Sequence, residues 1–396
     1  MNNIYRMTII SSLVFGAIGV SAPLMTIYLQ ELGASFSRIS LILTSYAAIL
    51  MVSNYAWGRL SDWIGRRKPL VVIGLFSVSI AFALLSRAPN DNWAWGIRIL
   101  EGLSLAAYNT TSLALMGDLL ASAGKRGQKI GIFRGIGSFA FAIGALLGGR
   151  IADAYTTGTA LLFSAIFYLI AACVALTLHE ERSASSPEKT VSEVNEKDTP
   201  KPLYQRPPAF FLLGVFLWTA AHGASASMWP NYMISLGYNK TVTSSLWALA
   251  AAVEGIGMPL VGILSDSIGR FPILVMGGIG IMLVQVGYIT VARWIPALMG
   301  VHVVRGFGFA SYTTGAMTFT AEIGDKKVRG NNSGTFYTAS STGQLFGSML
   351  GGNLVDFAGF TILFSVCGVM AFLSAVSFGF LGKTHRKKLE ANYNET

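Results

Sequence analysis

The chain has 396 residues, of which 53% are hydrophobic and only 12% are charged, with a mean hydropathy of +0.55 and a formal net charge of +10. This composition lies far outside the range of soluble globular domains, so it predicts a membrane protein whose main partner is the lipid bilayer. The excess of Lys and Arg then indicates orientation across the membrane, and it is not a sign of nucleic-acid binding.

Apolar stretches of about 20 residues, each long enough to cross roughly 30 Å of hydrocarbon as a helix, follow one another along the chain. We predict twelve spans, at residues 8–29, 39–58, 69–86, 93–117, 130–149, 158–178, 208–229, 243–263, 272–291, 295–319, 331–352 and 359–381. The segments between them are too short to fold as a separate domain. The sequence therefore predicts an all-α membrane protein.

The positive charges of the chain are distributed unequally between the two ends of the predicted spans. With the N-terminus inside, only five Lys or Arg residues fall on the outer side, namely Arg38, Arg87, Arg150, Lys240 and Arg293. Because Lys and Arg are enriched in cytoplasmic loops, this asymmetry predicts a multi-pass protein of the cell membrane with both termini in the cytoplasm.

One long polar segment, residues 179–207, is rich in charge, Ser and Pro and has almost nothing to bury. It predicts a flexible cytoplasmic linker between an N-terminal six-helix bundle, residues 1–178, and a C-terminal six-helix bundle, residues 208–396. Landmarks in the two halves keep a constant offset of 204 residues, or of 203 residues after one deletion. The pairs include Gly58 and Gly262, Asp62 and Asp266, Gly65 and Gly269, Tyr108 and Tyr312, Gly148-Gly149 and Gly351-Gly352, and Asp153 and Asp356. Two parallel repeats of this kind indicate a transporter with its substrate site between the halves.

The segment GRLSDWIGRRK at residues 58–68 resembles the loop G-x-L-x-D-x-x-G-R-[RK]-[RK] of the major facilitator superfamily. The second copy keeps the glycines, the acid and the first Arg but has Phe271-Pro272 in place of the last two basic residues. The resemblance, with the twelve spans and the repeat, covers essentially the whole chain. It implies a major facilitator fold, a transport function without enzymatic activity, and a monomer that binds a small molecule.

In this loop, glycine tolerates the positive φ that a sharp turn at the end of a helix requires, which we expect of Gly58 and Gly65. The resemblance implies that Asp62 and Arg66 form a latch across the two bundles when the outer side is open. The latch then also includes the turn glycines Gly262 and Gly269 and the charged residues Asp266, Arg270, Asp118, Arg126, Glu322 and Arg329. For Arg67 and Lys68, anchoring of the loop by positive charge is an equally good interpretation.

Ionisable residues inside the spans carry the mechanistic information, since each costs about 3 kcal/mol at a helix centre unless it is compensated. They are Arg98, Glu101, Arg134, His222, Glu254, His302 and Arg305. Arg98 and Glu101 are three residues apart on one helix face and within pairing distance, in a segment that resembles the R-x-x-Q-G-x-G motif of proton-coupled family members. His302 and Arg305 occupy the equivalent positions in the second half. We expect all of them except Arg134 to face one central cavity.

Two functions fit this cluster. Either Glu101 or Glu254, with His222 and His302, carries a proton, or the Arg residues bind an anionic substrate group. A static buried pair of Arg98 and Glu101 is the alternative without function. Side chains that we expect to line the cavity and suit an amphipathic substrate are Arg98, Arg305, Tyr28, Tyr108, Asn109, Trp218 and Tyr312, although core packing explains the aromatic ones equally well.

The fifth span, with GSFAFAIGALLGG, resembles an exporter-associated pattern of the superfamily, but Ala145 stands where the pattern has Pro. A matching GSMLGG at residues 347–352 suggests that the glycines are packing surfaces of the repeat. We therefore predict a proton-coupled antiporter that exports a small amphipathic organic molecule by rocker-switch alternation. The alternative is a proton symporter that takes up an organic anion or a sugar.

Other classes of protein are disfavoured by the sequence. GFLGKT at residues 379–384 lacks the first Gly of a phosphate loop and follows a transmembrane helix instead of a strand. No span has metal-ligand spacing, so we expect no metal and no cofactor, with the proton gradient as the energy source. A channel, the remaining alternative, is expected to carry a filter or a ring of like charges.

Overall fold

The structure is a computed structural model that describes residues 3–121, 126–179, 204–324 and 328–394. Within its helices, the side chains at 62, 113–114, 116–121, 126–135, 329 and 386–394 are outside the description. The helices are α1 (Asn3–Ser21), α2 (Met25–Glu31), α3 (Phe36–Ile64), α4 (Lys68–Leu85), α5 (Asp91–Ala121), α6 (Arg126–Ala154), α7 (Thr157–Leu176), α8 (Ala209–Ser235), α9 (Lys240–Ile268), α10 (Arg270–Thr290), α11 (Ile295–Glu322) and α12 (Arg329–Asn394).

The predicted first span is divided in the structure. α1 ends at Ser21 and the short helix α2 begins at Met25, with Pro23 in the turn between them. Proline has no N–H to donate and its ring collides with the preceding turn of a helix, so it interrupts the helix here. The prediction of one continuous helix over residues 8–29 is therefore wrong.

The last two predicted spans are joined in the helix α12. Its backbone breaks at Gly359, which has φ of 81° and ψ of 174°. A chain that turns back into the membrane at this point needs a backbone conformation that residues with a side chain rarely adopt. With α12 counted as two spans and α1 and α2 as one, the described helices correspond to the twelve predicted spans.

Nine of the described helices are long and apolar enough to cross a membrane. The two long helices outside that set are α5 and α11. These are the helices that carry Arg98, Glu101, His302 and Arg305. Charged side chains inside a membrane protein normally face the interior of the bundle, so α5 and α11 are the helices to examine for a site.

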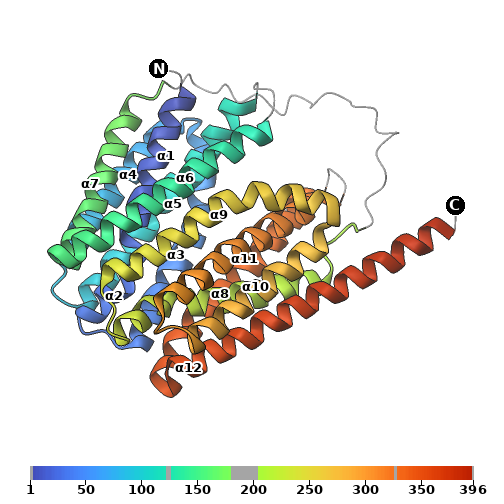
Figure 1. The fold of residues 1–396 in the computed structure, drawn as a ribbon. Coiled ribbons are helices and arrows are strands. Elements are labelled where there is room, and N and C mark those ends of the chain that lie inside the picture. Colours follow the sequence, from blue (N-terminus) through green and yellow to red (C-terminus); the bar gives the residue numbers. More distant parts are fainter. Residues whose placement is uncertain (1–2, 122–125, 180–203, 325–327, 395–396) are drawn as a thin grey trace.

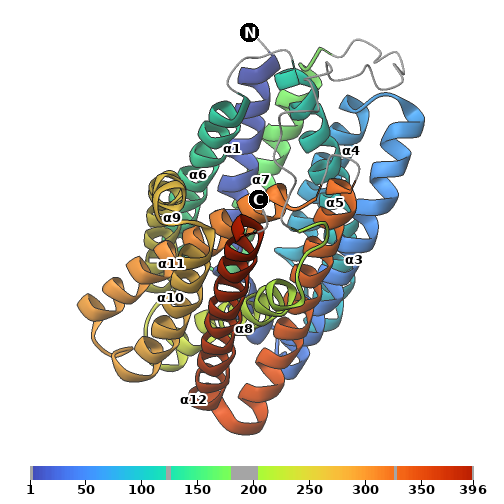
Figure 2. The ribbon, with the colours of Figure 1, turned by 90° about the vertical axis from the view of Figure 1, so that its right-hand side faces the viewer.

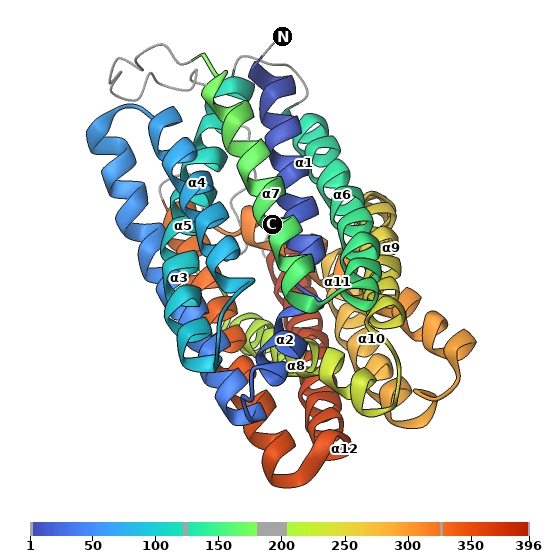
Figure 3. The same cartoon turned by 90° about the vertical axis from the view of Figure 1, so that its left-hand side faces the viewer.

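The two halves repeat the same helix packing. In the first half α4 packs on α5 and α7, and α3 packs on α5; in the second half α10 packs on α11 and α12, and α9 packs on α11. Between the halves, α6 packs on α9 and α3 packs on α12, which are equivalent contacts under the repeat. Figures 2 and 3 show the α6 and α9 contact from two sides.

The ends of the molecule differ. We call the end where α1 begins and α7 ends the linker face, and the other end, with α2 and the first turns of α3 and α9, the opposite face. The ribbons of the two halves converge at the opposite face and diverge toward the linker face (Figure 1). Where both partners are described, the hydrogen bonds and ion pairs between the halves lie toward the opposite face, and an example is Asn231 Nδ2, which donates to Thr26 O at 3.0 Å.

Glycines bring the helices of each half into backbone contact at equivalent positions. A Cβ on Gly144 would lie 2.1 Å from Gly16 O, and a Cβ on Gly347 would lie 2.1 Å from Ala220 O. Such distances exclude any side chain, so only glycine permits this approach. The glycines of the exporter-like pattern thus have matching packing roles in both halves, and they are no separate indication of export.

Candidate functional site

The larger of two cavities between the halves, here called the central cavity, has a volume of about 550 Å³. Helices of both halves contribute to its walls. Its polar and charged lining residues are Ser21, Thr26, Tyr46, Arg98, Glu101, Tyr168, His222, Ser227, Trp247, Gln344 and Ser348. Apolar residues such as Leu43, Leu50 and Phe82 make up much of the rest. The cavity therefore offers hydrogen bonds and apolar surface together, as sites for amphipathic molecules do.

The charged wall of the central cavity is an ion pair on α5. Arg98 Nη1 donates to Glu101 Oε2 at 2.5 Å, and the two residues are 6% and 3% exposed. The guanidinium also lies over the ring of Tyr46, 3.8 Å from its centroid. Helical spacing of three residues places both side chains on one face, as predicted. Pairing lets two charges remain in an interior where either alone would be costly.

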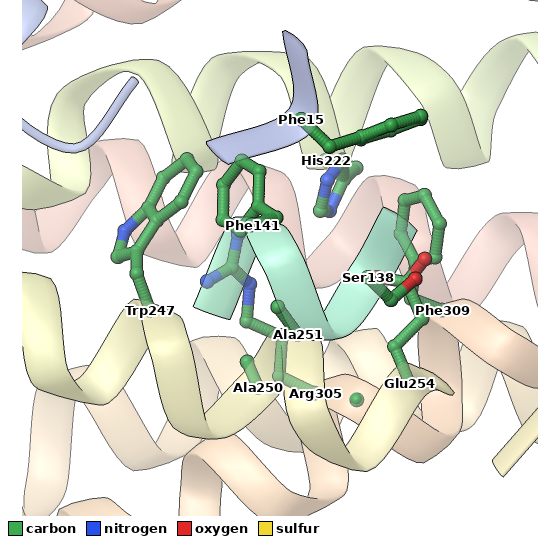
Figure 4. Close-up of a pocket in the computed structure, with 11 residues that line it drawn as sticks. Phe15, Ser138, Phe141, His222, Trp247, Ala250, Ala251, Glu254, Arg305 and Phe309 are labelled. Carbon is green, nitrogen blue, oxygen red and sulfur yellow. The ribbon is translucent and has the colours of Figure 1, made fainter. Parts of the chain in front are cut away.

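The smaller cavity, here called the side cavity, has a volume of about 240 Å³. Figure 4 shows Glu254 at one end with Ser138 and Phe309, and the Arg305 guanidinium toward the other end with Trp247. Glu254 and Trp247 are both on α9, seven residues and two turns apart, so they lie on the same face. Glu254, His222 and Arg305 all line this cavity between the halves, and their roles in transport are still predictions.

Aromatic side chains set the position of Arg305. Its guanidinium lies over the ring of Trp247, 4.6 Å from the centroid. Trp247 in turn stacks on Phe141 of the first half, with centroids 6.4 Å apart. In each half, the Arg that lines a cavity rests on an aromatic ring, Arg98 on Tyr46 and Arg305 on Trp247, which is a favourable arrangement for a cation removed from water.

The two cavities share a wall made of His222, Trp247 and Phe309. The imidazole of His222 packs on Phe309, with centroids 5.2 Å apart, and on Trp218 at 5.0 Å. This shared wall lies between the ion pair on α5 and the acid on α9.

His302 was expected to face the cavity, and this expectation is wrong. Its side chain is 0% exposed and packs between Trp229 and Tyr288, with ring centroids 4.6 and 5.8 Å away. It lines neither cavity. His302 and Arg305 are three positions apart on α11, and the packing of that helix places His302 in the core of the half and Arg305 at its inner surface.

The aromatic residues expected in the cavity are also in the cores of the halves. Tyr28 donates from its hydroxyl to Leu85 O at 2.6 Å, and Trp218 donates from Nε1 to Gly277 O at 3.1 Å. Tyr312 stacks on Trp218 with centroids 3.7 Å apart, and Tyr108 is 5% exposed. Neither these four nor Asn109 line the two cavities. Core packing, the alternative explanation, is correct for the aromatic residues.

The charge network of the second repeat is present at the linker face. Arg270 binds Asp266 Oδ1 at 2.7 Å and Glu322 Oε1 at 2.9 Å, and all three residues belong to the second half. The side chains of Asp62, Asp118, Arg126, Arg134 and Arg329 lie outside the described residues. The latch between the halves is therefore still a prediction, and Arg66 at this face is exposed.

The glycines of the two charged turns have different tasks. Gly65 and Gly269 have φ of +65° and +92° and end α3 and α9, which confirms the sharp turn. Gly58 and Gly262 are inside those helices, so positive φ was the wrong explanation for Gly58. A Cβ on either would make only ordinary contact with an equivalent threonine, Thr110 at 3.9 Å and Thr314 at 4.0 Å, so packing does not require glycine at these two positions.

The sequence analysis missed Tyr46, Trp247 and Phe141, which support the two Arg residues or connect the halves. Only Trp247 had a usable signal, since it precedes Glu254 by seven residues on a helix. No group of three or more His, Cys, Asp or Glu side chains that could hold a metal ion occurs in the described part of the chain.

Comparison with known proteins identifies a matching family and several relatives. A family model described as Major Facilitator Superfamily matches residues 7–294 and 288–395. A putative sugar efflux transporter of Deinococcus radiodurans is 26% identical over 94% of this chain and 96% of its own. A maltose permease of Geobacillus stearothermophilus is 24% identical over 91% of each chain. The crystal structure of the nucleoside transporter NupG, 14% identical, superposes with a TM-score of 0.78 over 96% of this chain and 99% of that one.

Proposed function

Because this chain belongs to the Major Facilitator Superfamily and is therefore a secondary transporter and not an enzyme, we propose that it is a proton-coupled antiporter that exports a small amphipathic organic molecule. One observation supports the proposal above all. Each half supplies an acid, Glu101 or Glu254, to a cavity between the halves, and each cavity also holds an Arg on an aromatic ring.

The proton is carried by one of these two acids. A carboxylate that alternates between a wet and a closed environment binds a proton when it is dry and releases it when it is hydrated. A substrate whose polar part binds the Glu101 carboxylate beside Arg98 favours the deprotonated acid, so substrate and proton compete for Glu101. Glu254 shares its cavity with Arg305, and the same competition applies there.

The substrate binds in the central cavity. The ion pair and the hydroxyl and amide groups hold the polar part of the molecule, while Leu43, Leu50 and Phe82 contact its apolar part. The mixture of apolar and hydrogen-bonding walls is the reason for preferring an amphipathic substrate. Relatives named as a sugar efflux transporter and a maltose permease make sugars the first class to compare with amphipathic drugs.

The linker face is the cytoplasmic face in this proposal. The distribution of Lys and Arg supports the assignment, because short cytoplasmic loops attract positive charge. The halves diverge toward that face (Figure 1), so the conformation is one that takes substrate from the cytoplasm. Rocking of the halves about the site would then open the opposite face to the outside.

Inside-out vesicles test coupling and direction together. With an acidic lumen, addition of maltose, uridine, ethidium or puromycin is expected to release protons for at least one compound, measured with a pH-sensitive dye, while that compound accumulates in the lumen. Uptake only in right-side-out vesicles under an inward proton gradient would overturn export and favour symport.

Glu101→Gln and Glu254→Gln test the carriers. We expect at least one of them to abolish gradient-driven transport while substrate exchange continues. The matched control is Asp91→Asn, which removes another carboxylate of α5. Asp91 Oδ2 pairs with Arg38 Nε at 3.1 Å, and neither residue lines the central or the side cavity. Full driven transport in both Glu variants would refute the role assigned to these acids.

A further inference from the structure

The opposite face holds two contacts between the halves that repeat each other under the duplication. Asp153, at the end of α6, accepts hydrogen bonds from the backbone N–H groups of Lys240 and Thr241 at 3.1 and 2.7 Å. Asp356, in the middle part of α12, accepts one from the N–H of Ser37 at 2.6 Å. Asp153 and Asp356 differ by 203 residues, and Ser37 and Thr241 differ by 204. Each half therefore supplies one acid and one helix N-terminus.

The donors are those that a helix cannot satisfy by itself. The first N–H groups of a helix have no partner within it. In α3 the N-cap Ser35 accepts from Arg38 N, and in α9 the N-cap Asn239 accepts from Val242 N at 2.9 Å. Each cap thus satisfies the third N–H of its helix. The N–H groups of Ser37, Lys240 and Thr241, which precede it, donate to the acids of the other half. A carboxylate at this position also gains from the positive end of the helix dipole.

We propose that Asp153 and Asp356 are a pair of locks that hold the opposite face closed and must open in each transport cycle. The acids and the helix ends that they bind belong to different halves, so separating the halves at this face breaks both contacts at once. Both carboxylates are exposed, and water replaces the lost hydrogen bonds when the locks open. Contacts of this kind bias an equilibrium without making one state permanent.

Neighbouring contacts make the two locks unequal. Beside Asp153, Lys240 Nζ pairs with Glu31 Oε1 of α2 at 2.6 Å. Beside Asp356 are an edge-to-face pair of Phe36 and Phe360, with centroids 5.4 Å apart, and a hydrogen bond from Gly352 N to Ser40 Oγ at 2.7 Å. Asp153 has two N–H donors and an adjacent ion pair, whereas Asp356 has one donor and a buried hydrogen bond nearby.

Distances between two spin labels report whether the opposite face is open or closed, and they can be measured without any substrate. Trp93 and Trp294 are each 64% exposed, near the opposite face, one in each half. Nitroxides at these two positions, with Cys173 and Cys367 replaced by Ala, report the separation of the halves by double electron–electron resonance. We expect Asp153→Asn and Asp356→Asn each to raise the open-to-closed ratio at this face about two- to fivefold, and the double variant about four- to twenty-five-fold.

The controls separate the locks from a general effect of charge. Asp91→Asn removes an acid at the same face that pairs with Arg38 within one half, and it should leave the distances unchanged. Asp153→Ala, which also removes the acceptor, should shift them further than Asp153→Asn. An unchanged distribution in the double variant, or an equal shift in Asp91→Asn, would overturn the proposal. Each single variant alters one exposed side chain and so tests it alone. Because the readout is conformational, it is independent of the proton coupling proposed above.

Discussion

α5 and α11 are equivalent helices of the two halves, yet they present different chemistry to the space between them. α5 carries Arg98 and Glu101, a neutral pair that lines the central cavity. The equivalent residues of α11 are His302 and Arg305, and only Arg305 reaches a cavity. The acid that accompanies it, Glu254, comes from α9. The two halves therefore share the same helix packing, but the partner of the Arg comes from the same helix in the first half and from a neighbouring helix in the second.

The ionic sites of the two halves differ in how strongly the stability of the protein depends on each charge. In the first half, the ionic site is one buried pair in which each charge depends on the other. In the second half, Arg305 rests on Trp247 and shares a cavity with Glu254, which is only half-buried. Variants that remove single charges should therefore affect the two halves unequally.

The largest expected effect follows from Arg98→Ala. It leaves the Glu101 carboxylate without its partner in a buried position, which should lower the free energy of unfolding by about 3 to 5 kcal/mol. Arg305→Ala should cost only about 1 kcal/mol, since the main loss is a cation–π contact. Thermal unfolding of the purified variants in one detergent measures the contrast.

A double variant sharpens this comparison. Arg98→Met with Glu101→Leu removes both charges and fills similar volume, so most of the stability should return while driven transport is lost. Equal melting temperatures for Arg98→Ala and Arg305→Ala would contradict the assignment of the buried pair.

An intermediate effect is expected at the aromatic rings. Trp247→Leu removes the ring under Arg305 and its stacking on Phe141, at a cost of about 1 to 2 kcal/mol. Because Trp247 lies in the wall shared by both cavities, the variant should also weaken substrate binding. Tyr46→Leu should lower the free energy of unfolding less, because the ion pair between Arg98 and Glu101 is retained. Ligand-dependent thermal shifts distinguish the two, and a larger loss for Tyr46→Leu would oppose this view.

A small effect is expected at the linker face. Glu322→Gln breaks an exposed ion pair with Arg270 inside the second half, so it should cost less than about 1 kcal/mol. Asp62→Asn, at the equivalent turn of the first half, should slow turnover while leaving binding intact if Asp62 bridges the halves. Turnover rates and substrate affinities of both variants provide the test, and wild-type turnover in Asp62→Asn would remove the latch.

The smallest effect on driven transport is expected for His302→Phe. The ring is enclosed by Trp229 and Tyr288 and lines neither cavity, so an apolar ring of similar size should cost less than about 1.5 kcal/mol. Driven transport should stay within about twofold of the wild-type rate. A loss as large as that in Glu254→Gln would return His302 to the site.

The fold was largely predictable because it depends on length and periodicity. Apolar stretches of membrane thickness give the spans, and the 204-residue offset between Gly65 and Gly269 gives the repeat. The break between α1 and α2 has a local signal in the sequence, which is Pro23. The pairing of Arg98 with Glu101 followed from their spacing on one helix, and the side cavity contains Glu254 and Arg305 as expected.

The aromatic part of the site could not be predicted in the same way. Helices that are apolar on every side give no pattern that fixes their rotation, so Trp218 and Tyr312 could not be told from residues of the cavity. The wrong placement of His302 has the same origin. Contacts at the opposite face, such as Asp356 with Ser37, join positions that are distant in sequence, and only the packing of the halves brings them together.

The most direct test of the central claim is a binding measurement on purified protein in weakly buffered detergent with a pH-sensitive dye. Titration with the compound that gives the strongest thermal shift should release protons from the wild type, and the release should be absent in Glu101→Gln or in Glu254→Gln. Binding of that compound without proton release at any pH between 5 and 8 would contradict competition between substrate and proton at these acids.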